Sequence, residues 1–304
     1  MGPIAAGVFS LLAFASLPLV PLLGAFFALL TPLPLVHLVA SGRTSALGWG
    51  WVVVALTGAA LTWQAPWLAA ASLGYLLLGA WPALAIEWWL RRPWRTGRWT
   101  ALITLVALAA LMLSLLAAFS PEAPAAGLEA VLAGTTSEAM EMMRQLGTAG
   151  AGGEELLSRA MHLAAYLLPS VGALYILMSA LWLRPRLPLL GLERGGEPFH
   201  SYSSEDWLPV GFALGGIGWV YAGGELKWLA TNLFVTVLGL YFVHGLAIIH
   251  FYLGRRFGGN RWVRLAVALF TLQIPVAVVL SALGLADTFV ALRRGHQWDE
   301  GSEA

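Results

Sequence analysis

The sequence consists largely of long apolar stretches that contain almost no charged residues. Several of them reach or approach the roughly 20 residues that an α-helix needs to cross the hydrocarbon core of a bilayer. Apolar residues make up 59% of the chain and charged residues 11%, whereas an ordinary soluble domain is about a quarter charged. A soluble fold of this size could not hide so many apolar side chains, because surface falls too slowly with size. The sequence therefore predicts an all-α membrane protein.

Nine apolar stretches are candidate transmembrane helices. They are residues 4–17, 19–40, 47–63, 68–90, 99–120, 158–183, 206–222, 228–253 and 262–286. Pro18 and Pro21 leave two alternatives for the first pair, which are a tight turn between two spans or a kink in one long helix. The stretches are continuously apolar, without the alternation typical of a membrane β-barrel. The prediction is a bundle of eight or nine transmembrane helices.

Tryptophan and arginine support these boundaries and indicate an orientation. Tryptophan favours the headgroup region, and twelve tryptophans fall at or near the proposed ends: Trp49, Trp51, Trp63, Trp67, Trp88, Trp89, Trp94, Trp99, Trp182, Trp207, Trp228 and Trp262. Arginine collects in short cytoplasmic loops. The arginines cluster within residues 91–98, 184–194 and 255–264, and Arg43 stands alone between the second and third spans. These four loops are therefore expected on the cytoplasmic side.

The same orientation places the long connection 121–157 outside the membrane. This segment carries six glutamates and one arginine. Ser137 is a plausible N-cap for a short amphipathic helix, which either lies on the membrane surface or covers a cavity that opens outward. The predicted organisation is an N-terminal bundle of about five spans (1–120), this acidic extracytoplasmic segment (121–157), and a C-terminal part (158–304) of three to four spans with an interfacial tail.

The C-terminal end does not fit this orientation directly. Nine spans that begin inside would place Arg293 and Arg294 outside. Two explanations remain open: a re-entrant last segment broken near Pro275, or a tail that lies along the outer interface. In either case Asp287 needs a partner, because an acidic side chain near lipid costs a few kcal/mol.

The segment from Asp287 to Arg294 is expected to be an ordered helical continuation that charges hold in place. Asp287 would take a partner from a neighbouring loop. The arginines would reach headgroup phosphates or a loop carboxylate such as Glu193 or Glu197.

Several function classes find no support in the sequence. The net charge of +1 gives no basic surface for nucleic acid. The chain has no cysteine, which excludes thiolate metal sites and thiol catalysis. No nucleotide-binding or hydrolase motif occurs, and no clustered acid–base groups are apparent at one depth. We therefore expect no metal, no cofactor and no enzymatic activity.

Polar residues at membrane depth are the remaining candidates for a binding site, because they are costly and often functional. Glu87 is either a buried carboxylate that faces a cavity or an interfacial partner of Arg91, four residues further on. Asn232, Tyr241 and His244 are polar positions on the eighth span. For His244 the alternative to a ligand contact is a hydrogen bond between helices.

A second group of residues is expected to have structural or interface roles. Gly211 and Gly215 form a small-xxx-small pair, which usually indicates close helix packing. The other members are Arg43, Asp287 and Arg293.

Short motifs along the chain resemble the YybS-like family of uncharacterised bacterial membrane proteins. They are Pro32-Leu33-Pro34 with Ser41-Gly42-Arg43, Pro198-Phe199 with Trp207-Leu208-Pro209, Tyr241 to Ala247, and Gly284-Leu285-Ala286-Asp287 with Arg293-Arg294. His244 stands where that family tends to have glutamine, and Ala291 where a second acidic residue is usual.

That family is similar in its N-terminal part to the substrate-binding (S) components of energy-coupling-factor transporters. The resemblance implies a small-solute-binding subunit in a bacterial inner membrane, with an ATPase module as its partner. A small-residue surface for docking such a partner would be Ala55, Gly58, Ala59 and Ala60. The alternative is a membrane scaffold or regulatory protein that transports no ligand.

Overall fold

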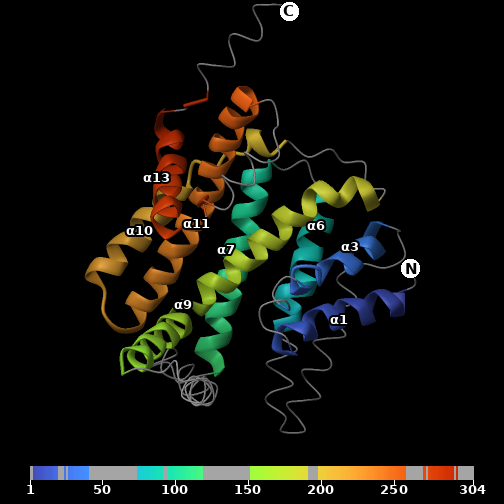
Figure 1. Ribbon diagram of the computed structural model, residues 1–304, viewed down its shortest axis with the longest axis horizontal. Coiled ribbons are helices and arrows are strands. Elements are labelled where there is room, and N and C mark those ends of the chain that lie inside the picture. The colour runs from blue at the N-terminus through green and yellow to red at the C-terminus, as the bar shows by residue number, and fades with distance from the viewer. Residues whose placement is uncertain are drawn as a thin grey trace, which may run out of the picture. The chain divides into compact units, whose positions relative to one another are not determined.

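The computed structural model describes residues 3–19, 24, 27–40, 74–91, 95–118, 151–190, 198–257, 270–271, 273–290 and 292–293. These residues form helices and turns and contain no strand, which confirms the all-α class. The helices are α1 (Pro3–Leu19), α3 (Pro32–Ala40), the π-helical turn η1 (Leu76–Ala80), α6 (Trp81–Arg91), α7 (Thr96–Ala118), α9 (Ala151–Leu183), the 3-10 turns η2 (Arg184–Leu190) and η3 (Phe199–Ser201), α10 (Leu208–Tyr221), α11 (Gly224–Phe257) and α13 (Ile274–Val290) (Figure 1).

Three helical segments are long and apolar enough to cross a membrane by length and composition. They are Thr96–Leu116, Ser158–Pro188 and Gly224–Arg256. Shorter apolar helices cover Ile4–Ser16, Leu76–Leu90, Leu208–Tyr221 and Ile274–Val290. The total of eight or nine spans stays a prediction, because the span 47–63 and the first part of the span 262–286 lie outside the described residues.

Three other expectations also fall wholly or mainly outside the described residues. Arg43, the small-residue surface from Ala55 to Ala60 and the amphipathic helix after Ser137 belong to this group. The division at 121–157 into an N-terminal and a C-terminal part therefore stays a prediction. One difference is visible at its end, because α9 begins at Ala151 and includes Gly152 and Gly153, which lie within the predicted extracytoplasmic segment 121–157.

The chain forms two compact units, and both take residues from either side of segment 121–157. The first comprises Met1–Ala107, Leu174–Glu205 and Leu240–Ala304. The second comprises Leu108–Ala173 and Asp206–Gly239.

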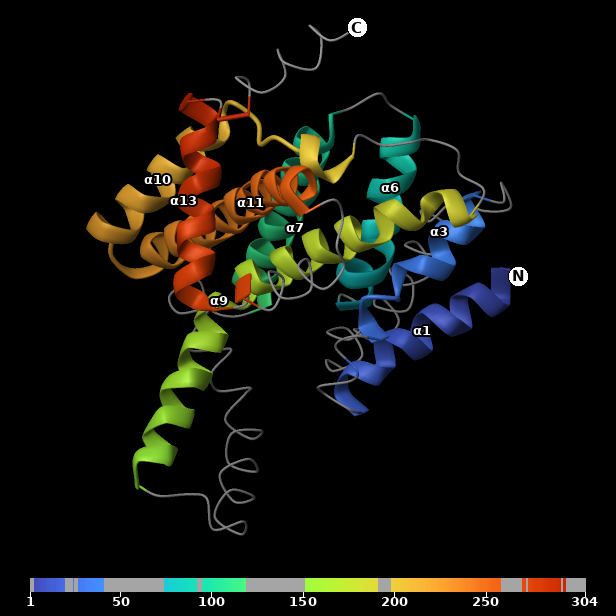
Figure 2. The same cartoon turned by 45° about the horizontal axis from the view of Figure 1, so that its top comes forward.

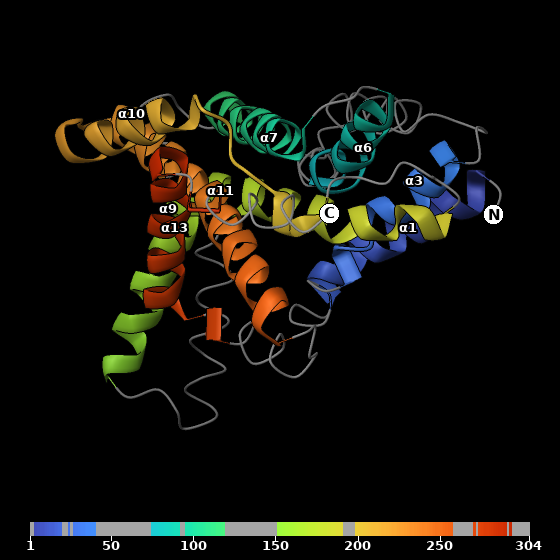
Figure 3. The same ribbon diagram turned by 90° about the horizontal axis from the view of Figure 1, so that it is seen from above.

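In the first unit, the chain reverses direction between α1 and α3. Ser10 Oγ donates to the Thr31 carbonyl at 2.8 Å and contacts the Tyr75 hydroxyl at 2.9 Å. Residues 10 and 31 would lie about 30 Å apart in one straight helix. The first two apolar stretches therefore form a hairpin, as the tight-turn alternative requires, and α3 packs between α1 and α6 (Figure 3).

Some tryptophans at helix ends hold helices together instead of anchoring them at the membrane interface. Trp99 of α7 is 1% exposed, and its indole N–H donates to the Ala85 carbonyl of α6 at 2.8 Å. Trp81 of α6 donates to the Ile103 carbonyl of α7 at 3.1 Å. A buried indole needs an acceptor for its N–H, and these contacts fix α6 against α7 at two levels.

In the second unit, α10 and the first half of α11 form a tight helical hairpin (Figure 2). The turn uses Gly224, whose φ of 55° is readily adopted by glycine. A Cβ on Gly215 would lie 2.9 Å from the backbone of Phe234, and one on Gly211 would lie 3.5 Å from Val237. The structure thus places Gly215 at a close backbone contact, whereas Gly211 lies at ordinary van der Waals distance from the same helix.

Asn232 of α11 bridges two backbone groups of α9 beside a proline. Pro169 lies inside α9, where proline distorts the backbone. The N–H of Ser170 donates to Asn232 Oδ1 at 3.0 Å, while Asn232 Nδ2 donates to the Tyr166 carbonyl at 3.0 Å. The amide thereby satisfies a donor and an acceptor of the α9 backbone next to Pro169. Both its donors are used within the fold, since Nδ2 also reaches the Trp228 carbonyl.

The predicted orientation can be tested by cysteine labelling, because the chain has no native cysteine. Ser201 and Gly223 are exposed and lie on either side of α10. If α10 crosses the membrane, Gly223→Cys should react with an impermeant maleimide added to intact cells, and Ser201→Cys should react only after permeabilisation. Labelling of both from one side would show that α10 does not cross, and the reversed pattern would overturn the orientation derived from arginine.

Candidate functional site

Two glycines bring α11 and α13 into backbone contact in the first unit. A Cβ on Gly245 would lie 2.1 Å from the Leu280 carbonyl oxygen, and one on Gly284 would lie 2.1 Å from the Tyr241 carbonyl oxygen. Such distances leave no space for a side chain. His244 adjoins Gly245 in sequence, and Asp287 follows Gly284 by about one helical turn. The crossing therefore sets these two polar residues opposite each other.

A third element, the segment 202–205 between η3 and α10, completes the site. It packs against the start of α7, where a Cβ on Gly97 would lie 1.8 Å from the Ser203 carbonyl oxygen. Tyr202 is buried, and its hydroxyl lies 2.9 Å from Thr100 Oγ1. Thr100 Oγ1 donates its only hydrogen to backbone carbonyls of α7, so Tyr202 is the donor. Burial raises the pKa of the Tyr202 phenol to about 12, which keeps it protonated at physiological pH.

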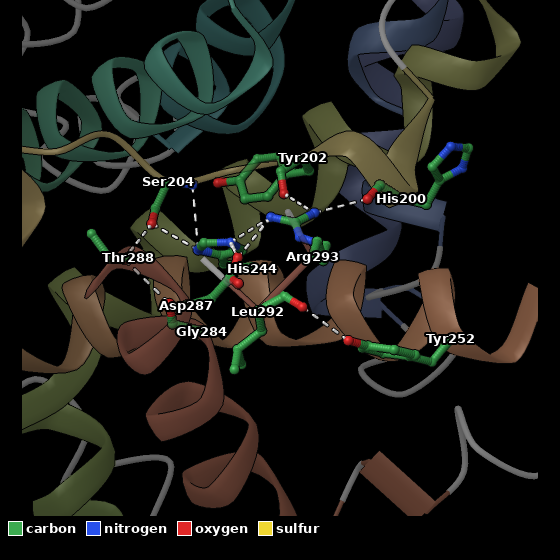
Figure 4. A network of polar contacts seen from close by, with 10 residues as sticks. All are labelled: His200, Tyr202, Ser204, His244, Tyr252, Gly284, Asp287, Thr288, Leu292 and Arg293. Atoms are coloured by element: carbon green, nitrogen blue, oxygen red, sulfur yellow. Dashed lines mark hydrogen bonds and ion pairs between the residues drawn. The ribbon is translucent and has the colours of Figure 1, made fainter. Parts of the chain in front are cut away.

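The polar network joins Ser204, His244, Asp287 and Arg293 (Figure 4). Ser204 Oγ lies 2.8 Å from His244 Nδ1. On the other side of the ring, His244 Nε2 lies 2.9 Å from Asp287 Oδ2. The same carboxylate oxygen accepts from Arg293 Nη2 at 2.9 Å. Ser204, His244 and Asp287 are all buried.

The contacts of His244 favour one tautomer. The backbone N–H of Ser204 can only donate, and it points to Nδ1 at 3.4 Å. The Asp287 carboxylate can only accept, and it faces Nε2. The proton therefore belongs on Nε2, which leaves Nδ1 to accept from Ser204. Arg293 Nη2 lies 2.8 Å from His244 Nε2. In this tautomer both nitrogens are donors, and both donate to Asp287 Oδ2.

Arg293 ties the C-terminal end to the rest of the site. Its Nη1 donates to the His200 carbonyl at 2.8 Å and to the Tyr202 carbonyl at 2.9 Å. The C-terminal end has a second hydrogen bond, in which the Tyr252 hydroxyl donates to the Leu292 carbonyl at 3.1 Å. From the sequence, headgroup phosphates or loop carboxylates were the expected partners of Arg293. The structure gives it Asp287 and the carbonyls of the 198–205 segment instead.

One oxygen of the buried carboxylate remains available. Asp287 Oδ1 accepts no hydrogen bond from the part of the chain that the structure describes. Two hydroxyls of the network have other contacts. Thr288 Oγ1 donates to the Gly284 carbonyl at 3.3 Å, and Ser204 Oγ lies 3.4 Å from Thr288 Oγ1. A buried acceptor without a donor costs about 1–3 kcal/mol, so this oxygen needs an explanation.

The predicted site residues separate into three places. His244 belongs to the network, and Tyr241 lies one helical turn away and interacts with Thr288. Glu87 is buried on α6 and is not among the ten residues of the network in Figure 4. Asn232 lies in the second unit, in its bridge to α9. Within the described residues, no group of three or more His, Asp or Glu is placed to hold a metal.

No sequence pattern predicted a site role for Ser204 or for the glycines at the close contacts around the site. Ser204 is one of three serines within 201–204, and no sequence pattern distinguishes it from the other two. Gly97, Gly245 and Gly284 are far apart in sequence, and their contacts exist only in the folded chain. The sequence also revealed no cluster of acid–base groups, whereas the structure brings a serine, a histidine and a carboxylate together.

The apolar helices, with a buried polar network where two of them cross, define the chain as a helical integral membrane protein. The comparison with known families agrees: the model described as "Predicted membrane protein (DUF2232)" matches residues 7–288, and the chain belongs to this family. No curated protein and no solved structure matches it. These comparisons do not show the likeness to transporter S components.

Proposed function

We propose that the protein binds a small solute at the Asp287 site within the membrane. The observation that carries this proposal is the buried oxygen Asp287 Oδ1, which accepts no bond from the described residues. Ionisable groups inside membrane proteins are costly and usually functional. A donor group of a solute would satisfy this oxygen and remove the cost of leaving it unpaired.

The charges around Asp287 favour a neutral solute over a cation. Arg293 already forms an ion pair with the carboxylate at 2.9 Å, so the pair has no net charge while His244 is neutral. A cation at Oδ1 would be attracted by Asp287 but repelled by the guanidinium. We therefore propose a neutral molecule that carries an N–H or O–H donor, with Tyr241 and Thr288 beside it.

The resemblance to S components supports a more specific form of this proposal. Such a subunit would capture the solute and depend on a separate ATPase module in a bacterial inner membrane. The alternative is a scaffold or regulatory protein, in which the network only holds α11, α13 and the C-terminal end together. The saturated contacts of Arg293 favour this alternative, whereas the open Asp287 oxygen favours the solute.

The test is native mass spectrometry of the protein purified from its own membrane. The expected result is a released small molecule that Asp287→Asn loses and the exposed control Asp206→Asn keeps. Asp287→Glu, which retains the charge and moves the oxygens, should weaken retention without abolishing the fold. A co-purifying ATPase would support the transporter form. Absence of any retained molecule from the wild-type protein, with a stable protein partner instead, would favour the scaffold.

A further inference from the structure

We propose that Ser204 is a nucleophile, activated by His244, that takes an acyl group from the bound solute. This inference rests on the proposed solute site, because an acyl compound has to lie against Ser204 Oγ. The geometry that carries it is the chain of contacts from Ser204 Oγ to His244 Nδ1 at 2.8 Å and from His244 Nε2 to Asp287 Oδ2 at 2.9 Å. It reverses the expectation that the chain is not an enzyme.

The arrangement has the three parts that nucleophilic catalysis by a hydroxyl requires. A serine is a weak nucleophile unless a base within hydrogen-bonding reach takes its proton, and a third group has to orient that base. The Ser204 N–H and the Asp287 carboxylate hold His244 in the tautomer with a free lone pair on Nδ1. That lone pair points at the Ser204 hydroxyl, so the proton can leave Oγ as it attacks.

Asp287 and Arg293 act as positioning residues in this scheme. The carboxylate fixes the ring through Nε2 and stabilises the imidazolium that forms when Nδ1 takes the proton. Arg293 holds the carboxylate at 2.9 Å and is itself fixed by two backbone carbonyls. The charges of Asp287 and Arg293 compensate each other, and the Nδ1 atom that faces the Ser204 hydroxyl is the base of the scheme.

The position of Ser204 suits a reaction that needs water. It lies in the 202–205 segment between η3 and α10, and its neighbour Ser203 is exposed. Ser204 itself is 8% exposed, which shields the hydroxyl from bulk water until a substrate is bound. Gly97 fixes the segment against α7, so the nucleophile is held on a rigid support.

The proposed reaction is acyl transfer to Ser204 followed by hydrolysis. A bond forms between Ser204 Oγ and the acyl carbon, and the bond from that carbon to its leaving group breaks. The proton of Oγ passes through His244 Nδ1 to the leaving group. Water then attacks the acyl carbon and gives a proton to Nδ1. The bond from the acyl carbon to Oγ breaks, and Nδ1 returns the proton to Oγ, which releases a carboxylic acid and the free serine. The sum is one acyl compound and one water giving one acid and one protonated leaving group.

The test uses a fluorophosphonate probe on the detergent-purified full chain. Attack by Oγ forms an O–P bond and releases fluoride, with the proton leaving as HF. Peptide mass mapping of the wild-type protein should locate the label on Ser204. Ser204→Ala should abolish labelling and Ser203→Ala, its exposed neighbour, should not. His244→Gln should slow labelling about 100-fold or more, as expected for loss of a general base.

A purely structural network predicts different results. Asp287→Asn should lower the labelling rate even under conditions where the variant remains folded, which a stabilising role alone would not produce. Absence of label from wild-type Ser204, or equal labelling of the Ser204→Ala variant, would overturn the inference. If the wild-type protein and Ser204→Ala both retain a solute while no label appears, the proposed binding function stands and the nucleophile fails. Label on Ser204 without any retained solute would support the nucleophile and overturn the binding site.

Discussion

Replacing Asp287 by asparagine is expected to lower the free energy of unfolding by about 3–5 kcal/mol, the usual cost of breaking a buried ion pair from one side. The side chains of Asp287 and Arg293 are 6% and 12% exposed. The substitution leaves the guanidinium without its anionic partner and gives His244 a neutral amide in place of the carboxylate. The melting temperature in detergent should fall clearly below that of Asp206→Asn. Asp206 is exposed, so its change should stay within about 0.5 kcal/mol.

A double-mutant cycle separates the pair from its surroundings. Arg293→Gln alone removes the bonds to His200 and Tyr202 as well as the ion pair. Asp287→Asn with Arg293→Gln leaves no unpaired charge, so its cost should be smaller than the sum of the two single changes by about 0.5–3 kcal/mol. Additive effects would show that the two side chains are not coupled. Rapid proteolysis at Arg293 in the intact wild-type protein would show that the C-terminal end is not held in place.

The helices themselves follow from the sequence, because apolar length is a strong signal in lipid. The stretches 99–120, 158–183 and 228–253 correspond to α7, α9 and α11. Two observations differ from what general residue preferences predict. Gly152 and Gly153 continue α9 although glycine disfavours helices, and Trp99 is buried although tryptophan favours interfaces. In both cases local preference yields to helix geometry and packing, which a single sequence does not display.

The site shows what the sequence could and could not supply. The sequence identified His244 as a polar residue within an apolar stretch and Asp287 as an acidic residue beside one. It did not predict that they pair, because they are separated by 43 positions and meet only where Gly245 and Gly284 allow two backbones to touch. Ser204 had no signal of its own. Asn232 illustrates the opposite error: its polarity suggested a ligand site, but its amide is used to bridge the α9 backbone at Pro169.

The glycine crossing itself is expected to be intolerant of a single added methyl group. A Cβ on Gly284 would lie 2.1 Å from the Tyr241 carbonyl oxygen and 2.9 Å from the Gly245 backbone nitrogen. Both neighbours are backbone atoms, so no side chain can rotate away and the two helices have to separate. Overpacking of this kind costs about 1–3 kcal/mol and occasionally more. Gly284→Ala should therefore lower the melting temperature in detergent and widen the gap between His244 and Asp287.

Gly254 provides a control for this prediction on the partner helix of the crossing, the one that carries Gly245. It lies on α11, and a Cβ there would meet nothing within 4 Å among the described residues. Gly254→Ala should stabilise the protein by about 0.5–1 kcal/mol, because alanine is the better helix former. The opposite signs of the two glycine-to-alanine changes are the expected signature of a backbone crossing. If both raised the melting temperature, α11 and α13 would not touch at Gly284, and the crossing would not be what sets His244 against Asp287.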